Sequence, residues 1–261
     1  MKNLALITGA SSGIGAELAQ IHASRKGDLI LVARRKDELE RLAQDLRQKH
    51  GVDVKVMVKD LSVHGASKEL VDDLGDLAAE VEILMNNAGF GGFGNFADRP
   101  LEKEQEMIRL NITALTDLTH LIIPHMIKKG RGRILNTASS AGFMPGPLQA
   151  VYFATKAYVV SFTQGIHHEL KPHGISVTAL CPGPVSTGFE KTAGLEGVDL
   201  FKMAVKPIHT AKAGYRGMEK GRMIVFDQRL LSFSVNWLIP FMPRNPLLKM
   251  VQKMQTPKGL K

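Results

Sequence analysis

The chain has 261 residues, of which 44% are hydrophobic and 23% charged, a composition that excludes a disordered, collagen-like or disulfide-scaffold protein. Its single cysteine, Cys181, precludes an intrachain disulfide and favours a reducing, cytoplasmic location. The net charge of +9 fits nucleic acid, an anionic membrane surface, or an anionic cofactor and substrate, but the basic residues are dispersed without a nucleic-acid motif, so no nucleic acid is expected as a partner.

Short apolar runs alternate with amphipathic segments along most of the chain. Buried strands are predicted at residues 4–7, 29–32, 54–58, 81–85, 133–137 and 175–180. Helices are predicted at residues 14–25, 36–50, 66–79, 102–129 and 151–170, and Pro124 is a candidate bend in the fourth. Repeated strand–helix units predict a parallel sheet covered on both faces. Right-handed crossovers make this a doubly wound, Rossmann-type α/β fold.

No linker or internal repeat interrupts this alternation, so we expect a single domain over residues 1–261. The N-terminal residues enter a strand and a glycine turn, which is not the pattern of a signal peptide. No run reaches the ~18 apolar residues expected of a membrane-spanning helix. Because no second cysteine or cluster of His, Asp and Glu is present, no metal site is predicted.

Three glycines follow the first predicted strand in the pattern G-x-x-x-G-x-G. Glycines let the backbone turn sharply and approach a pyrophosphate, and the following helix presents its N-terminal N–H groups. Two serine hydroxyls in the turn add hydrogen-bond donors. The alternative is a tight strand-to-helix turn without a ligand. The residues predicted to bind the cofactor here are Gly9, Ser11, Ser12, Gly13, Ile14 and Gly15.

The end of the second predicted strand is basic. An acidic residue there would accept the ribose 2′-OH of NAD, but this chain has Arg34 and Arg35. Guanidinium groups suit a phosphate monoester, so NADP is favoured over NAD as the cofactor. The alternative is a pair of surface arginines that open a helix. Asp60 and Leu61, after the third strand, are weaker candidates for binding the adenine edge.

Tyr152 and Lys156 form a Y-x-x-x-K pair on one face of a predicted helix, and Ser139 lies thirteen residues before Tyr152. A free phenol has a pKa near ~10, and an adjacent ammonium group is expected to lower it toward the operating pH. Ser139 can hydrogen-bond a carbonyl oxygen that gains negative charge. Y-x-x-x-K pairs occur by chance in many helices, so the spacing to Ser139 and the glycine turn carry this assignment.

Seven short motifs follow one another in this order: T-G-A-S-S-G-I-G (8–15), D-L (60–61), N-N-A-G (86–89), L-N (110–111), S-S (139–140), Y-F-A-T-K (152–156) and P-G-P-V-S-T (182–187). In these motifs and their spacing, the chain resembles the short-chain dehydrogenase/reductase family over residues 3–190. The resemblance implies a homo-oligomer, because dimers and tetramers are common in that family.

The resemblance also implies roles for individual residues. It makes Ser139, rather than Ser140, the catalytic serine. Tyr152 would be the general acid in reduction and the general base in oxidation, and Lys156 would also bind the nicotinamide ribose. Asn111 would hold a helix bend and a water in a proton relay from Lys156. Further residues implied to contact the cofactor are Asn87, Ala88, Gly89, Pro182, Gly183, Val185 and Thr187.

Residues 188–261 are expected to form a substrate lid and an apolar C-terminal segment. Gly194 and Gly197 could permit lid movement. Residues 230–242 are strongly apolar, and basic residues flank them: Arg229, Arg244, Lys249 and Lys253. Three interpretations stay open, namely peripheral membrane contact through residues 230–253, a cap over a long hydrophobic substrate, and a subunit contact.

Together these features predict an NADP-dependent oxidoreductase. It would transfer a hydride between nicotinamide and a carbonyl or secondary alcohol of an apolar substrate, such as an acyl chain, a cyclic ketone or a steroid-like compound. One alternative is a nucleotide-binding regulator or scaffold without turnover, against which the intact catalytic residues argue. Another is a lyase or epimerase on the same fold. The expected location is cytoplasmic or peripheral to a membrane.

Overall fold

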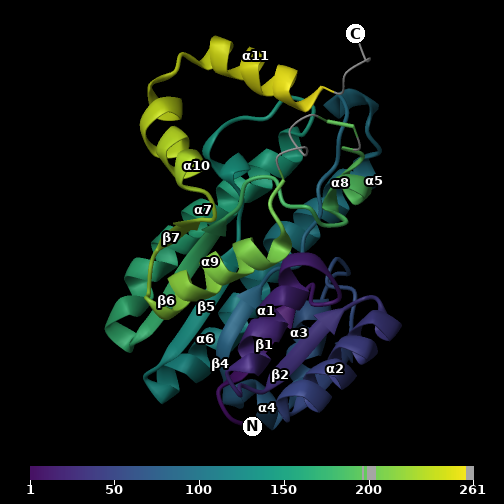
Figure 1. Ribbon diagram of the computed structural model, residues 1–261, viewed down its shortest axis with the longest axis vertical. Coiled ribbons are helices and arrows are strands. Elements are labelled where there is room, and N and C mark those ends of the chain that lie inside the picture. Colours follow the sequence, from purple (N-terminus) through teal and green to yellow (C-terminus); the bar gives the residue numbers. More distant parts are fainter. Residues whose placement is uncertain (196, 199–203, 257–261) are drawn as a thin grey trace.

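The computed structural model describes residues 1–195, 197–198 and 204–256, and its centre is a seven-stranded sheet (Figure 1). The strands are β1 (Leu4–Thr8), β2 (Leu29–Ala33), β3 (Val54–Val58), β4 (Val81–Asn86), β5 (Gly132–Thr137), β6 (Ile175–Cys181) and β7 (Ile224–Phe226). All pair in parallel, in the order β3-β2-β1-β4-β5-β6-β7. The strand order reverses between β1 and β4, which confirms the predicted doubly wound, Rossmann-type fold and marks where such folds bind ligands.

Helices cover both faces of the sheet. One face carries α1 (Gly13–Ser24), α2 (Lys36–His50) and α9 (Pro207–Glu219). The other carries α3 (Ala66–Leu74), α4 (Asp76–Glu80), α6 (Leu115–Lys129) and α7 (Ala150–Leu170). The helix α5 (Leu101–Ile108) leads into α6 through a π-helical turn over Arg109–Ala114.

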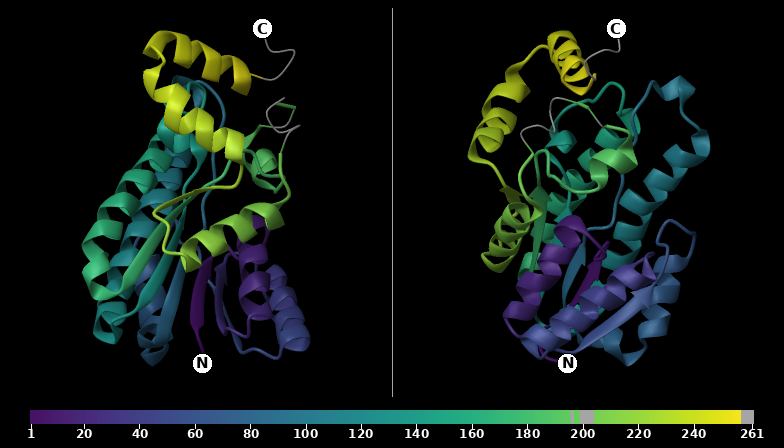
Figure 2. Two further views of the ribbon diagram at one scale, coloured as in Figure 1. Left: turned by 60° about the vertical axis from the view of Figure 1, so that its left-hand side comes forward. Right: turned by 45° about the vertical axis from the view of Figure 1, so that its right-hand side comes forward.

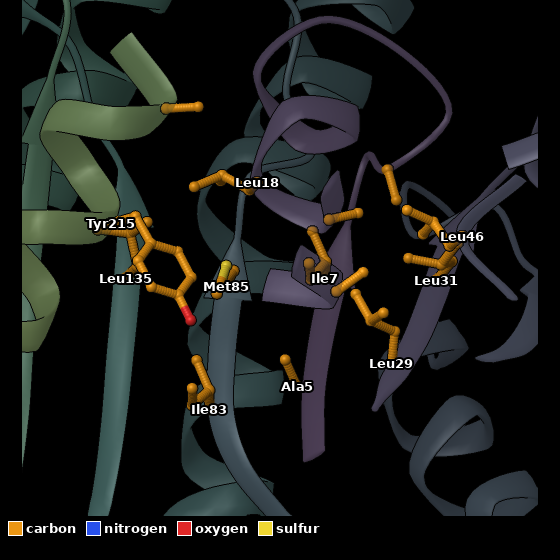
Figure 3. Packing of buried hydrophobic residues seen from close by; sticks show 14 of the residues in the cluster. Ala5, Ile7, Leu18, Leu29, Leu31, Leu46, Ile83, Met85, Leu135 and Tyr215 are labelled. Atoms are coloured by element: carbon orange, nitrogen blue, oxygen red, sulfur yellow. The ribbon is translucent and has the colours of Figure 1, made fainter. Parts of the chain in front are cut away.

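Strand β1 explains this two-sided cover. Successive strand side chains point to opposite faces, so a strand that is apolar at every position needs helices on both sides. Ala5 and Ile7 belong to the cluster under α1 and α9, whereas Leu4 and Leu6 belong to the cluster under α3 and α6. Figure 3 shows the first cluster, with side chains from the helices resting on those of the central strands.

Three features differ from the sequence-based expectation. The helix predicted over residues 66–79 is divided between α3 and α4 at Gly75, whose φ of 55° favours glycine. The helix predicted over residues 102–129 contains the π-helical turn, while Pro124 lies inside α6. Strand β7 was not predicted, because a strand of three residues is too short to show a periodicity.

The C-terminal helices lie beyond the carboxyl ends of the strands. They are α8 (Phe189–Ala193), α10 (Arg229–Phe233) and α11 (Arg244–Gln255), and Figure 2 shows them at the end of the molecule far from the N-terminus. A π-helical turn over Ser234–Leu238 and a 3-10 turn over Ile239–Phe241 connect α10 to α11. Of the predicted lid and tail, residues 196, 199–203 and 257–261 lie outside the described residues. Across the described ranges, no helix is both long and apolar enough to cross a membrane.

Two glycines should respond oppositely to substitution by alanine. A Cβ at Gly15 would press on the Gly9 carbonyl oxygen and lie 2.6 Å from Asn87 Nδ2, so Gly15→Ala should lower the free energy of unfolding by about 1–3 kcal/mol. Gly165, exposed in α7, has no neighbour within 4 Å of a new Cβ, so Gly165→Ala should raise it by about 0.5–1 kcal/mol. Urea unfolding measures both, and equal shifts would contradict the close approach at Gly15.

Candidate active site

The carboxyl ends of β1, β4 and β5 are tied together by polar side chains. Thr8 Oγ1 accepts hydrogen bonds from the backbone N–H groups of Asn87 and Ala88, each at 3.0 Å. The Asn87 amide donates to the Thr8 carbonyl oxygen at 3.2 Å and accepts from Thr137 Oγ1, also at 3.2 Å. The first turn, the segment after β4 and the end of β5 therefore hold a fixed mutual position.

The glycine turn lies against two other predicted cofactor segments. Gly9 has a φ of 65°, and a Cβ there would lie 2.8 Å from Ala88 Cα. Gly13 has a φ of 56°, and its Cβ would lie 3.0 Å from Thr187 Cγ2. Only glycine fits these positions without strain. The bare backbone and the N-terminal N–H groups of α1 border the cavity described below, an arrangement that fits a bound pyrophosphate.

Arg34 and Arg35 differ in their surroundings. Arg35 donates from Nη2 to Ser12 Oγ at 2.6 Å and to Ser11 Oγ at 3.0 Å, so its guanidinium lies beside the glycine turn on uncharged partners. Arg34 Nη1 lies 3.6 Å from a carboxylate oxygen of Asp60 and 3.7 Å from one of Glu106. These two carboxylates offset much of the charge of Arg34.

Asp60 also has an ordered surrounding. Ser62 donates to its Oδ1 from both backbone and side chain, at 3.0 and 2.7 Å. Burial by itself would raise the pKa of this carboxyl, but the Ser62 hydrogen bonds and the Arg34 charge together hold it below its ordinary value. Asp60 therefore stays ionised at the edge of the cavity.

One cavity of about 860 Å³ brings together most of the predicted site residues. Those that line it are Gly9, Ser11, Ser12, Gly13, Ile14, Arg34, Arg35, Asp60, Leu61, Asn87, Ala88, Gly89, Ser139, Tyr152, Lys156, Pro182, Gly183, Val185 and Thr187. Gly15 and Asn111 lie behind the wall. They belong to the packing that shapes the cavity rather than to its surface.

Ser139, Tyr152 and Lys156 come from two neighbouring elements. Ser139 precedes the 3-10 turn Ser140–Phe143 and accepts a hydrogen bond from Ala141 N at 3.1 Å, which does not use its O–H donor. Tyr152 and Lys156 lie one turn apart on α7. The buried Lys156 ammonium donates to the Thr137 carbonyl oxygen at 2.7 Å and lies 5.9 Å from the centre of the Tyr152 ring.

The expected lowering of the Tyr152 pKa is wrong for this structure. Burial raises the pKa of Tyr152 to about 12, and the hydrogen bond with Ser139 opposes this only in part. Burial also lowers the pKa of Lys156 to about 8. Both groups are therefore driven toward their neutral forms, because desolvation at this depth outweighs the attraction expected from sequence spacing alone.

Asn111 lies in the π-helical turn between α5 and α6, and its side-chain nitrogen and oxygen both make hydrogen bonds. Its amide donates to the Phe90 carbonyl oxygen at 3.0 Å and to Thr155 Oγ1 at 3.1 Å, and its Oδ1 accepts from Phe90 N at 3.2 Å. Thr155 in turn donates to the Tyr152 carbonyl oxygen at 2.7 Å. Asn111 thus holds the segment after β4 against α7, and its implied part in a proton relay stays a prediction.

The loop after β6 is held in place by Asp227, which follows β7. Gly183 N donates to Asp227 Oδ1 at 3.1 Å, and Thr210 Oγ1 donates to Asp227 Oδ2 at 2.7 Å. Ser140 N donates to the Pro182 carbonyl oxygen at 2.8 Å, which connects the loop to the segment that contains Ser139. Asp227 was not predicted, because nothing in its local sequence distinguishes it from a surface aspartate.

The sequence suggested a cap over an apolar substrate but did not identify the residues of the apolar part of the cavity. Its additional lining includes Met144, Phe153, Phe189, Leu231, Leu238, Ile239, Met242, Met250, Val251 and Met254, together with Gln149 and Gln255. The apolar run 230–242 was the only signal, and it does not say which side chains face inward. The structure shows that residues of the C-terminal segment contribute to the cavity wall.

The chain belongs to the short-chain dehydrogenase family of oxidoreductases. The family's sequence profile, described as short chain dehydrogenase, matches residues 3–196. Very-long-chain 3-oxoacyl-CoA reductase of Anas platyrhynchos is 36% identical over 193 residues, which make up 72% of this chain and 61% of that protein. The matched region thus spans about three-fifths of the length of this curated relative.

Two solved structures are similar over nearly the whole chain. A short-chain dehydrogenase from Sphingobium yanoikuyae in complex with NADPH is 33% identical, with a TM-score of 0.83 and 98% of each chain covered. The bulky-bulky ketone specific alcohol dehydrogenase from Comamonas testosteroni is 30% identical, with a TM-score of 0.77, covering 93% of this chain and 95% of that one. Both share the fold and support the assignment to the family.

The pH dependence of catalysis should report Lys156. For reduction, kcat/KM should decline as the pH rises through about 8, because the Lys156 ammonium loses its proton there while Tyr152, with a pKa of about 12, keeps its own. Steady-state rates across pH 6–10 measure this, with each ~1 pH unit beyond the midpoint costing about tenfold. Residual activity of Lys156→Arg should lack the decline, since arginine stays charged. A flat wild-type profile would contradict the assignment.

Proposed function

We propose that this protein is an NADPH-dependent reductase of apolar ketones that also catalyses the reverse oxidation of secondary alcohols. The observation that carries the proposal is the single cavity that contains a glycine turn, a basic corner, the residues Ser139, Tyr152 and Lys156, and an apolar wall. Bound NADPH would supply a hydride to the carbonyl carbon. The glycine turn fits its pyrophosphate, because bare backbone and the N-terminal N–H groups of α1 border the cavity there.

The chain's own residues would handle the oxygen of the substrate. Tyr152, which lines the cavity, donates its phenolic proton to the carbonyl oxygen as negative charge develops on that oxygen. Ser139 donates a hydrogen bond to the same oxygen, because the bond that it accepts from Ala141 N does not use its O–H donor. The Lys156 ammonium stabilises the tyrosinate formed and is held in place by the Thr137 carbonyl oxygen.

NADPH consumption by the purified protein tests this function. A panel of bulky apolar ketones and 3-oxoacyl thioesters should include substrates that oxidise NADPH, and Tyr152→Phe should reduce the rate by about a hundredfold or more. The phenylalanine keeps the packing against Phe189, whose ring centre lies 5.3 Å from that of Tyr152. NADPH binding without turnover across the panel would favour the scaffold, and turnover without net NADPH consumption would favour a lyase or epimerase.

Arg35 is the proposed main contact for the 2′-phosphate of NADPH, because its guanidinium lies beside the glycine turn on neutral partners. Arg35→Ala should weaken NADPH binding by about ten- to a hundredfold and leave NADH binding almost unchanged. Arg34→Ala should have a smaller effect, since Asp60 and Glu106 already offset its charge.

Fluorescence titration with both nucleotides measures this difference. Arg41→Ala is the control, because Arg41 is an exposed arginine of α2 that pairs with Glu38. Equal losses for NADH and NADPH, or a larger loss for Arg34→Ala, would overturn the assignment of Arg35.

The outer face of the C-terminal segment supports a second proposal, peripheral binding to an anionic membrane. Five of its apolar side chains are more than half exposed: Leu230, Phe233, Trp237, Leu238 and Phe241. Four exposed basic residues accompany them, Arg229, Arg244, Lys249 and Lys253, and residues 228–256 contain no Asp or Glu. Exposed apolar side chains next to uncompensated positive charge are typical of segments that lie in a membrane interface.

The same segment also borders the opening of the cavity. Leu238 and Met254 line the cavity and are also exposed, so the apolar mouth of the cavity would open toward the bilayer.

Trp237, the only tryptophan, makes this binding measurable. Its emission should shift to the blue with vesicles that contain phosphatidylglycerol, and much less with phosphatidylcholine alone or at high salt. Leu230→Ser/Phe241→Ser should lower vesicle binding by about tenfold or more, whereas Val63→Ser, at an exposed apolar residue outside the segment, should not. A shift that depends on protein concentration instead of lipid would identify the surface as a contact between subunits. Homo-oligomer formation and cytoplasmic location stay predictions.

A further inference from the structure

Two buried glutamine side chains meet in the wall of the cavity. Gln149 directly precedes α7 and Gln255 ends α11, 106 residues away. Gln149 Nε2 donates to Gln255 Oε1 at 2.6 Å. The side chains line the cavity although the two residues are only 7% and 2% exposed, so bulk water does not solvate them.

The contact leaves one donor and one acceptor unsatisfied. Gln149 Oε1 and Gln255 Nε2 have no hydrogen-bond partner among the described residues. If both amides were rotated, one carbonyl and one NH₂ group would still remain without a partner, so the conclusion does not depend on how the amides are oriented. A buried polar group without a partner is costly, and native structures rarely keep two together unless something else binds them.

The surroundings of this pair are apolar. Val251, one turn before Gln255 on α11, belongs to the buried C-terminal cluster, against which Met144 and Phe153 pack. All three side chains line the cavity with the glutamines. A ligand group that matched the two free amide atoms would therefore be recognised in a site of low dielectric, where a hydrogen bond is stronger than in water.

The pair lies close to the proposed reaction centre. Gln149 directly precedes α7, and Tyr152 is the third residue of that helix. A substrate whose carbonyl oxygen contacts Tyr152 would thus extend past the glutamines with the part of its skeleton nearest the carbonyl. Both glutamines are neutral, so they favour a neutral group over a carboxylate, which would offer Gln149 Oε1 no donor.

We propose that Gln149 and Gln255 form a polar subsite that binds a neutral hydroxyl group of the substrate, near the carbonyl group that is reduced. A hydroxyl accepts one hydrogen bond, from Gln255 Nε2, and donates one, to Gln149 Oε1, and so satisfies both free atoms. The substrate class is then narrower than apolar ketones in general, since it comprises bulky apolar ketones that carry a second, uncharged hydroxyl. This inference rests on the proposed function and deepens it.

The test compares hydroxylated cyclic ketones, with the hydroxyl at successive ring positions, with their deoxy analogues. At one of these positions the wild type should bind the hydroxylated ketone about ten- to a hundredfold more tightly and should show a similar preference in kcat/KM. Calorimetry in saturating NADP⁺ measures binding without turnover, and NADPH oxidation measures reduction.

The double variant Gln149→Leu/Gln255→Leu replaces both amides by apolar side chains of similar size. This variant should lose the preference, because it should bind the hydroxylated ketone more weakly than the wild type does. It should bind the deoxy ketone as tightly as the wild type, or more tightly. The control is Gln252→Leu, at an exposed glutamine of α11. It should change the binding of neither ketone. Because NADPH affinity and thermal unfolding report whether the double variant folds, a misfolded protein is recognised. In that case Gln149→Met and Gln255→Met are measured singly, and each should reduce the preference.

The outcomes separate this inference from the proposed function. In one outcome, the wild type and the double variant both reduce the hydroxylated and deoxy ketones with equal efficiency, whatever the ring position of the hydroxyl. This result would overturn the subsite and leave the proposed reductase function standing. Tight, hydroxyl-dependent binding without reduction would support the subsite and overturn the reductase. Failure to bind or reduce any ketone would overturn both.

Discussion

The hydrogen bonds between Thr8, Asn87 and Thr137 are the constraint on which the site depends. They join the ends of β1, β4 and β5, three adjacent parallel strands, at the edge of the sheet where the strand order reverses. The glycine turn follows the first of these strands, and the segment that contains Ser139, the proposed catalytic serine, follows the third. Without this connection, the relative position of the proposed cofactor turn and the proposed proton-transfer residues would depend on independent loops. Loop residues vary far more in position than the strands of a sheet do.

Burial then decides the electrostatics of the site. Lys156 is held by the Thr137 carbonyl oxygen in a buried position, and desolvation lowers its pKa while it raises that of Tyr152. A tyrosine with a pKa of about 12 stays protonated at neutral pH and so carries the proton that reduction needs, and a lysine with a pKa of about 8 is mostly charged at neutral pH. Sequence spacing identified the two groups, but only their depth in the fold determined the direction of each pKa shift.

The cavity has two parts of different origin. The part assigned to the cofactor is built from strand ends and the turns that follow them, whereas the apolar part is built largely from the helices after β7. Those helices have two apolar sides: Ile239 and Met242 face the cavity, and Trp237 and Phe241 face outward. The amide pair of Gln149 and Gln255 is a polar contact between the two parts, at the point where α11 meets the start of α7.

The sequence by itself determined the parallel α/β fold, six of the seven strands, and the residues of the glycine turn and the Y-x-x-x-K pair. These depend on local patterns, namely runs of apolar residues and fixed spacings within one turn or helix. Tertiary structure alone decided the partners of Arg34 and Arg35, the anchoring role of Asp227, and the meeting of Gln149 with Gln255. Such contacts join residues tens to more than a hundred positions apart, and their energies depend on burial, which no local pattern encodes. Local patterns therefore identify the residues proposed for the chemistry, whereas the contacts proposed for selectivity form only when distant segments pack together.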